Sequence, residues 1–366
     1  MSHLNLAWRD RDNANDIPGT YLEAASFARI WPLQNVLHKQ FLVPSALKRG
    51  FILREETALK VIINGTHRVF ECRADTPLDA RELLDVDQDL AAGQDYYVYA
   101  CYDDADPLNP GVNLVVSLNS TYPDGYDAQT SRKIGGFHTL CADMGTIAGH
   151  PLSGMSAGDI LPASLWCLTH RPTCNPEGMV YVAELDLWVD IYLQSGTGTF
   201  TRSANGATIT DTRTWFDHVD DLAAVGKTLL TDTEFQICME GSNQKTAIRG
   251  AADPVTTGGH VDTAGRRMVS KYGLEDGCGT LWQWLDHPSA NGPYSGTDNP
   301  SLNGQPAGGW MNRPGGKGDL AGMSYAALAG GFWGNSTLCG SRCRNTDNPG
   351  TVTDADVGAR GRARSL

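Results

Sequence analysis

Long hydrophobic runs are missing from this sequence of 366 residues. No apolar stretch approaches the roughly 20 residues that a helix needs to cross a bilayer. The N-terminal segment, MSHLNLAWRDRDNAND, holds no apolar core of the kind found in secretory signal peptides. We therefore expect a protein that is made in the cytoplasm, with no signal peptide and no membrane insertion.

Positive charge is also scarce. The chain has 29 Lys and Arg residues against 42 Asp and Glu residues, a net charge of −13, which argues against nucleic-acid binding by a general basic surface. Hydrophobic residues make up 41% and charged residues 19%, a composition typical of a soluble globular protein. The length is sufficient for two or three domains, each with its own core.

Recognisable catalytic motifs are absent too. The sequence has no Gly-rich phosphate loop, no dinucleotide fingerprint and no nucleophile elbow. Asp354 and Asp356 lack the Gly and the terminal Glu of an EF-hand loop. Four histidines are single and scattered, which is more typical of structural side chains than of metal ligands: His138, His170, His218 and His260. We predict no catalytic residue, no metal and no cofactor.

The nine cysteines are odd in number and widely spaced, which does not fit a secreted disulfide framework. Reduced and mostly buried thiols are the simpler interpretation. Cys339 and Cys343 are the one pair at close spacing, C-x3-C. Such a pair could bind Cu(I) or serve redox chemistry, although no His or further Cys lies nearby in the sequence to complete a tetrahedral site.

The first half of the chain reads as a segment of unclear fold, residues 1–44, followed by a β-sandwich-like domain at 45–164. Within the first segment, TYLEAASFARIW could form one short helix. The domain is indicated by strand-like runs rich in Val, Ile and Tyr: LKVIING, HRVFECRA, DYYVYACYD and VNLVVSL. Asn64-Gly65 predicts a tight hairpin turn.

The second half, residues 165–366, combines strands with one clear helix and favours a mixed α+β class. GMVYVAELDLWVDIYL predicts a strand or hairpin with core positions at Val180, Val182, Leu185 and Trp188. GKTLLTDTEFQICMEGS predicts a helix that Thr231 caps, that Glu234 completes as a capping box, and that Gly241 ends. After residue 242 periodicity fades into a long stretch rich in Gly, Asn and Trp.

Motifs in this half occur in a family-specific order. LLTDTEFQICMEGS, GCGTLWQWLDH and the closing GGFW, GSR and VGARG stretches resemble C-type lectin folds of the formylglycine-generating-enzyme type. With GQDYYVYACYDD, GYDAQTSRKIGGFH, DPVTTGG and SKYG, they resemble the variable proteins of diversity-generating retroelements, the family of the phage tropism determinants. The resemblance spans residues 45 to 361.

This resemblance implies a receptor-binding protein whose C-terminal C-type lectin domain carries a variable region at about 330–361. It implies a homotrimer on a phage tail or a cell surface, a protein or other surface receptor as partner, and no enzymatic activity. Sugar-binding C-type lectins hold Ca²⁺ with a Pro flanked by two ligand residues. Here Pro349 is flanked by Asn348 and Gly350, so calcium-dependent sugar binding is not expected at this site.

In this family a reverse transcriptase rewrites template adenines, so that Asn codons become many residue types. The family's variable positions fall on Phe332, Gly334, Asn335, Ser336, Leu338, Asn345, Asp347, Asn348, Val352, Asp354, Asp356 and Val357. The resemblance assigns Trp333, Arg342 and Arg360 to the fixed scaffold, where Trp supplies an anchor and Arg a fork of hydrogen-bond donors.

Spacing places the predicted contact residues in three segments. Val352, Asp354 and Asp356 are two apart, as on one face of a strand. The group around Asn345 to Asn348 is expected in the preceding loop, and Gly334 to Leu338 in another. Together they would form one exposed, acidic patch.

Two alternatives remain open from the residues. The first is a formylglycine-generating-type oxidase that uses Cys339 and Cys343. The second is a structural virion component whose C-terminus is not diversified.

Overall fold

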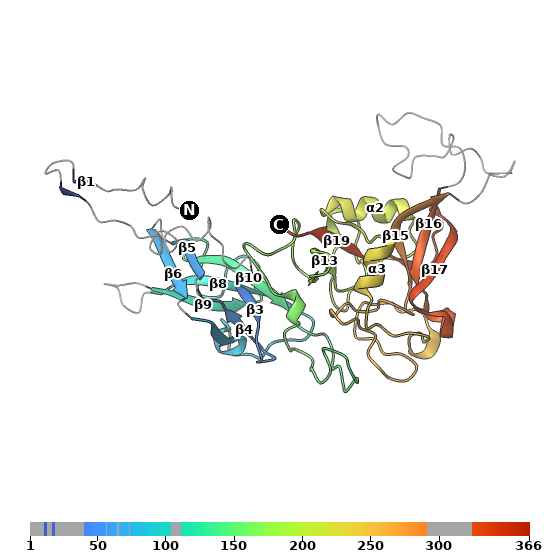
Figure 1. Ribbon diagram of the computed structural model, residues 1–366, viewed down its shortest axis with the longest axis horizontal. Helices are drawn as coiled ribbons and strands as arrows, with labels where there is room; N and C mark the ends of the chain where they lie inside the picture. Colours follow the sequence, from blue (N-terminus) through green and yellow to red (C-terminus); the bar gives the residue numbers. More distant parts are fainter. Residues whose placement is uncertain are drawn as a thin grey trace, which may run out of the picture. The chain divides into compact units, whose positions relative to one another are not determined.

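The computed structural model describes residues 11–12, 17–18, 40–55, 57–63, 66–72, 74–103, 111–290 and 324–366. The chain divides into two compact units (Figure 1). Unit 1 comprises residues 1–88, 97–135 and 167–170, and unit 2 comprises residues 89–96, 136–166 and 171–366. The helix expected for TYLEAASFARIW and the turn expected at Asn64-Gly65 lie outside the described residues.

The described part of the chain is mostly β, with few helices. Its α-helices are α2 (Trp215–Ala224) and α3 (Asp232–Cys238). The mixed α+β class expected from the sequence is therefore not confirmed. Strands predicted from the first half are confirmed, because each Val-, Ile- and Tyr-rich run lies in one: β5 (Thr57–Ile63), β6 (Thr66–Cys72), β8 (Asp95–Asp103) and β9 (Gly111–Ser117).

Unit 1 holds a three-stranded antiparallel sheet and a hairpin. The sheet has the order β3-β4-β7, from β3 (Leu42–Pro44), β4 (Gly50–Leu53) and β7 (Thr76–Asp79). Two short strands near the N-terminus, β1 (Arg11–Asp12) and β2 (Ile17–Pro18), pair antiparallel. In the hairpin, β5 and β6 pair in a register that brings Ile63 opposite Thr66, as a two-residue connection requires.

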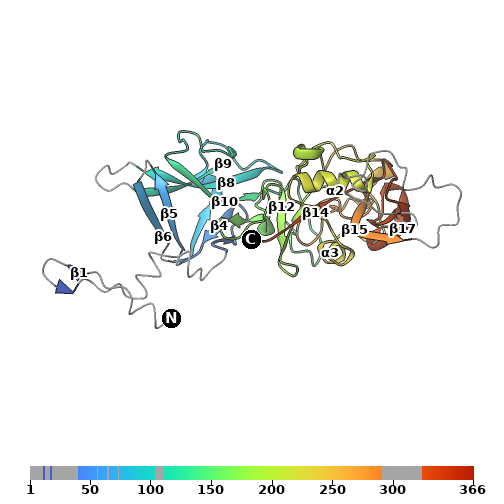
Figure 2. The ribbon, with the colours of Figure 1, turned by 90° about the horizontal axis from the view of Figure 1, so that it is seen from above.

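A four-stranded sheet of order β11-β10-β8-β9 includes β10 (Ser131–His138) and β11 (Trp166–Cys167). Figure 2 labels its strands β8, β9 and β10. Residues 96 to 101 of β8 are all buried, so this strand is covered on both of its faces. Gly136 of β10 is required for close packing: a Cβ there would lie 2.5 Å from the carbonyl oxygen of Tyr96 and 2.8 Å from the Trp166 ring.

Unit 2 contains two four-stranded sheets. The first has the order β12-β13-β19-β14, from β12 (Met179–Val182), β13 (Leu187–Asp190), β14 (Thr228–Leu229) and β19 (Gly361–Arg364). The hairpin predicted around residue 185 is thus confirmed. Three of its four predicted core residues are fully buried, and Leu185 packs half-buried at the core margin. The last strand of the chain, β19, lies between β13 and β14.

The second sheet has the order β17-β16-β15-β18. Its strands are β15 (Trp282–Ala290), β16 (Ser324–Gly330), β17 (Gly340–Pro349) and β18 (Val357–Gly358). Alternate residues of β16 enter two separate cores, as the period of a strand dictates. Ala327 and Ala329 join a cluster with Phe235 of α3, whereas Ala326 and Leu328 join a cluster with Trp215 of α2. We call the latter the α2-side cluster.

The capping box predicted for α3 is confirmed. The Thr231 hydroxyl accepts from Glu234 N at 3.4 Å, and the Glu234 carboxylate accepts from Thr231 N at 2.8 Å. The helix ends at Cys238 with Met239 as its C-cap, so Gly241, the predicted end, whose φ is +83°, lies two residues beyond that cap.

Helix α2 was missed from the sequence, although a similar signal was present. Thr214 and Asp217 form a reciprocal capping box at 3.0 and 3.1 Å. Asp takes the place that the usual pattern gives to Glu or Gln.

Candidate binding site

The segment after β16 begins with a short 3-10 helix, η7 (Trp333–Leu338). Its start is fixed by a side chain, because Asn335 Oδ1 accepts from Phe332 N at 3.0 Å. Ser336 has a φ of +51°, an uncommon value for a residue with a side chain. Phe332 and Trp333 pack edge to face with their ring centroids 5.0 Å apart. The loop expected at Gly334 to Leu338 is therefore a tight helical turn.

Asn345, Asp347 and Asn348 lie in strand β17, which corrects their expected place in a loop. Asn345 is paired with Leu328, and Asn348 with Ala326. Polar side chains obscured the strand in the sequence, yet they are usual on an edge strand, where one side of the backbone meets no further strand. The side chain of Asp347 lies outside the described residues.

Val352, Asp354 and Asp356 lie in a loop, residues 350–356, which corrects their expected place on a strand. Local turns shape this loop, with Val352 N donating to Pro349 O at 3.0 Å and Val357 N to Asp354 O at 3.2 Å. Bonds to the rest of unit 2 fix its path. Gly350 O accepts from Trp215 N, and Asp356 O accepts from Trp282 N, each at 2.9 Å. Backbone contacts of this kind hold the loop independently of its side chains.

The structure brings predicted positions from all three segments to one side of the β17-β16-β15-β18 sheet. Phe332 and Val352 pack at the margin of the α2-side cluster, and Val357 is buried within it at 2% exposure. Asn345 is the cross-strand partner of Leu328, a member of the same cluster. We call this side of the sheet, together with η7 and the loop 350–356, the binding face, after the role that is proposed for it below.

Exposure divides the predicted positions on this face. Gly334, Ser336, Leu338 and Asp354 are exposed, whereas Phe332, Asn335, Asn345, Asn348, Val352 and Asp356 are half-buried. Val357 belongs to the core by burial, so a change of its size would disturb the packing. Ser336, Leu338 and Asp354 can change side chain with the least effect on the fold, whereas a Cβ at Gly334 would lie 2.7 Å from the Phe332 ring.

The three residues assigned to the scaffold have different environments. Arg360 is 1% exposed, Trp333 is half-buried and Arg342 is exposed. The Arg360 guanidinium donates to Gln283 Oε1 at 3.1 Å and to three backbone carbonyls at 2.5 to 2.7 Å. Burial lowers its pKa. Arg360 therefore joins distant segments of unit 2 in the core. Arg342 is exposed and cannot have the same buried role.

Arg344 is a structural residue that sequence reasoning missed. It forms an ion pair with Asp232 of α3, and its guanidinium carbon lies 5.1 Å from the centre of the Phe235 ring. Its Nη1 also donates to Ser341 O and Cys343 O at 2.8 Å. These contacts hold β17 against α3. No local pattern indicates a partner 112 positions away in the sequence.

Comparisons with known proteins identify relatives of this chain. Residues 47–167 match the family model of the Mtd second domain. A tail fiber receptor-binding protein of Bordetella phage BPP-1 is 28% identical over 296 residues, which cover 74% of this chain and 71% of that protein.

Solved structures agree along most of the chain. The Major Tropism Determinant I1 variant is 27% identical with a TM-score of 0.70, covering 90% of this chain and 85% of that one. The U1 variant is 25% identical with a TM-score of 0.70, covering 98% and 94%. The chain resembles the major tropism determinants. None of its helices among the described residues is long and apolar enough to cross a membrane.

The thiols near the face give no support to an oxidase in this tropism-determinant relative. Burial raises the pKa of Cys339 to about 12, and its Sγ donates to Phe332 O at 3.3 Å. Burial also raises the pKa of Cys343. Both thiols are therefore protonated near neutral pH, and the thiolate is the form that acts as nucleophile or metal ligand. All nine cysteines are free, and most are buried, as predicted.

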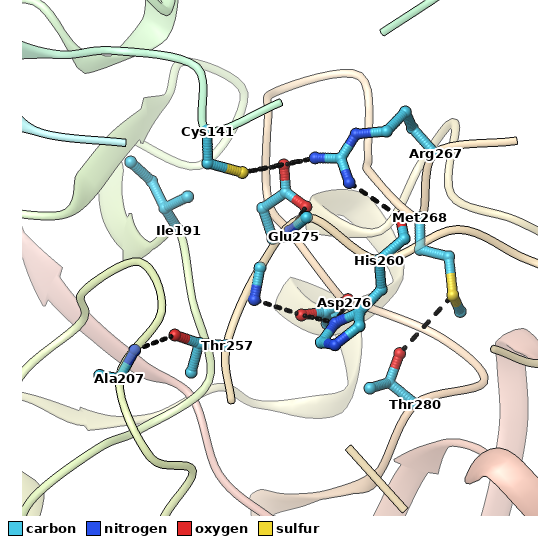
Figure 3. A network of polar contacts seen from close by, with 12 residues as sticks. Cys141, Ile191, Ala207, Thr257, His260, Arg267, Met268, Glu275, Asp276 and Thr280 are labelled. Atoms are coloured by element: carbon cyan, nitrogen blue, oxygen red, sulfur yellow. Dashed lines mark hydrogen bonds and ion pairs between the residues drawn. The ribbon is translucent and has the colours of Figure 1, made fainter. Parts of the chain in front are cut away.

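A polar network joins distant segments of unit 2 (Figure 3). Arg267 pairs with Glu275 at 2.6 Å, and Cys141 Sγ lies 3.3 Å from the same carboxylate. His260 Nδ1 lies 2.9 Å from Asp276. Since the Glu275 carbonyl also accepts from Arg360, the network connects Arg360 to Cys141, over 200 positions earlier in the chain.

Removing the Asn335 side chain should destabilise the protein measurably. Asn335→Ala deletes the acceptor for Phe332 N at the start of η7, and loss of such a cap costs about 1 kcal/mol. Urea unfolding would measure this change, with exposed Thr337→Ala as the matched control. Equal effects of the two substitutions would show that the Asn335 contact contributes nothing to stability.

Proposed function

We propose that this chain is the receptor-binding protein of a phage tail and that the binding face contacts the receptor. The main observation behind this proposal is that three separate segments meet around the α2-side cluster. They contribute Phe332, Asn345 and Val352. The similar Bordetella phage protein is called a tail fiber receptor-binding protein, and the similar structures are called tropism determinants. Both names describe binding to a target. Such a role suits a face whose exposed side chains can change while the core beneath them stays the same.

The fold of unit 2 in this proposal is a C-type lectin fold whose face is diversified by a retroelement. The proposal is supported by a division of roles: backbone atoms hold the loop in place, and its side chains remain available for contact with a partner. Gly350 and Asp356 are held through their backbone carbonyls, so the loop keeps its path when neighbouring side chains change. Arg360 and Arg344 anchor the segment from below through buried or half-buried contacts. Stability would thus reside mainly in the backbone contacts and the buried arginine, and specificity in the exposed side chains.

The proposal includes a homotrimer, a place on the virion tail or a cell surface, and no enzymatic activity. Several copies of one face raise the effective affinity by about 10²-fold or more when they engage together. The face is acidic. Burial and the charges of Asp354 and Asp253 raise the pKa of Asp356, so negative groups crowd one another there. A partner with basic groups would relieve this repulsion.

A selection experiment tests the proposal without knowledge of the natural receptor. A library of the full chain randomised at the exposed positions Gly334, Ser336, Leu338 and Asp354 should yield binders to lysozyme, a basic folded protein. Binders that retain Gly334 should unfold within about 0.5 kcal/mol of the parent, as expected for surface changes.

A matched library provides the control. It is randomised at four exposed positions of unit 1: Leu47, Glu82, Leu118 and Tyr122. If this library yields binders as often, the face has no special capacity for recognition and the proposal fails. A near-copy of the coding segment for residues 330–361 that differs only at adenines, beside a reverse transcriptase gene, would establish the diversification itself.

A further inference from the structure

Two segments outside the predicted variable positions border the binding face. The segment 209–212 is joined to the face because Thr212 N donates to Asp354 O at 3.3 Å. At its other end, Ile209 N donates to Val255 O at 3.1 Å, and Thr208 is bridged to Thr256. The segment 252–256 is therefore linked to loop 350–356 through residues 209–212.

These bordering segments present both apolar and acidic groups. The Val255 side chain is 72% exposed, the same fraction as Leu338 on the face itself. Asp253, two positions before Val255, is exposed, and Asp211 is half-buried. Burial and the charge of Asp211 raise the pKa of Asp253, and the charge of Asp253 in turn contributes to the raised pKa of Asp356. The carboxylates of the two segments and of the face are therefore close enough to interact.

We propose that Asp211, Asp253 and Val255 form a constant collar of the binding face, and that the collar contacts a protein segment presenting a Lys or Arg side chain beside an apolar one. The inference rests on the proposed function. Continuity with the face places the collar within reach of any partner bound there. Charge complementarity selects a basic group for the two aspartates, and the exposed Val255 supplies apolar surface that a neighbouring side chain would cover.

A constant collar has a distinct consequence for recognition. The variable positions decide which partner is bound, because their side chains differ between variants. The collar contributes the same favourable contact to each partner that carries the matching pair of groups. A newly diversified face would therefore start from weak affinity for basic protein surfaces rather than from none.

The lysozyme binders of the preceding section provide the test. In several independently selected binders, the double substitution Asp253→Asn with Val255→Ser should weaken lysozyme binding about tenfold, as loss of a significant contact does. Biolayer interferometry with the full chain would measure the dissociation constants. The effect of Asp253→Asn alone should shrink in 1 M NaCl, since salt screens exposed charges, whereas the effect of Val255→Ser should persist.

The control is Glu82→Gln with Leu47→Ser in unit 1, which removes one exposed carboxylate and one exposed aliphatic side chain. It should leave binding unchanged. Binders that are insensitive to the collar substitutions, or equally sensitive to the control, would overturn the collar while leaving the proposed function intact. A selection that yields no binders would overturn both.

Discussion

Replacing Arg360 with lysine is expected to lower the free energy of unfolding by about 3 to 5 kcal/mol. The guanidinium serves Gln283 and the carbonyls of Asp190, Ile191 and Glu275 at once. A lysine ammonium is a single point donor and cannot reproduce this planar fork. Several buried acceptors would lose their partners, and each such loss is unfavourable in a dry interior. Urea unfolding at neutral pH measures the change.

Arg342→Lys is the matched control, because the same chemical change is made at an exposed position. It should alter stability by less than about 0.5 kcal/mol. Comparing the two substitutions also tests whether Arg342 and Arg360, both assigned to the scaffold from the sequence, contribute equally to stability. If Arg342→Lys destabilises the protein as much as Arg360→Lys, exposure is a poor guide to the role of Arg342.

Acidification below pH 6.5 should destabilise the protein through His218. This side chain is fully buried in α2, and burial lowers its pKa to about 3. Gln194 Nε2 donates to Asp221 at 3.1 Å, so its Oε1 accepts from His218 Nδ1 at 2.9 Å. No described residue accepts a proton at His218 Nε2, and the folded protein therefore keeps the ring neutral.

The unfolded chain protonates this histidine near its ordinary pKa of about 6.5. Between that value and the lowered folded pKa, the unfolded state binds more protons, so stability falls as the pH falls. From pH 7 to pH 4.5 the contribution of His218 should decrease by about 2.5 kcal/mol. Urea unfolding across this range, compared with His218→Gln, isolates the effect. If the two proteins show parallel curves, His218 does not carry the acid sensitivity.

His260 acts in a separate pH window. Asp276 raises the pKa of His260 despite its partial burial. Its stabilising contribution is fully present below the unfolded pKa and is lost as the pH rises through the folded value. Stability therefore falls below about pH 6.5 because of His218 and above it because of His260. The His218→Gln variant keeps His260, so the comparison isolates the contribution of His218.

Local signals in the sequence were sufficient for the elements that carry them. The capping box at Thr231 and Glu234 is a contact between near neighbours, and the strand at Asp95–Asp103 has an apolar composition of its own. Helix α2 carried a local signal as well, in Thr214 and Asp217, but in a less usual form. Physical reasoning from short segments can recover features of this kind.

Elements that depend on distant partners could not be predicted in the same way. Strand β17 is polar, and only its pairing with β16 reveals it as a strand. The loop 350–356 contains residues two apart, yet bonds to Trp215 and Trp282 give it an irregular path. The ion pair of Arg344 joins two elements that are remote in sequence. The hydrophobic periodicity of a segment predicts its own secondary structure. It does not show which other element the segment packs against.

The position of β19 has a consequence for the synthesis of variants. This strand follows the predicted variable region in the chain, yet it fills the gap between β13 and β14 at the centre of a sheet. A frameshift or premature stop within residues 332–357 would remove Arg360 and β19 together. The truncated product would expose two strand edges and a core that cannot close. We therefore expect only chains with an intact reading frame through residue 364 to complete this sheet.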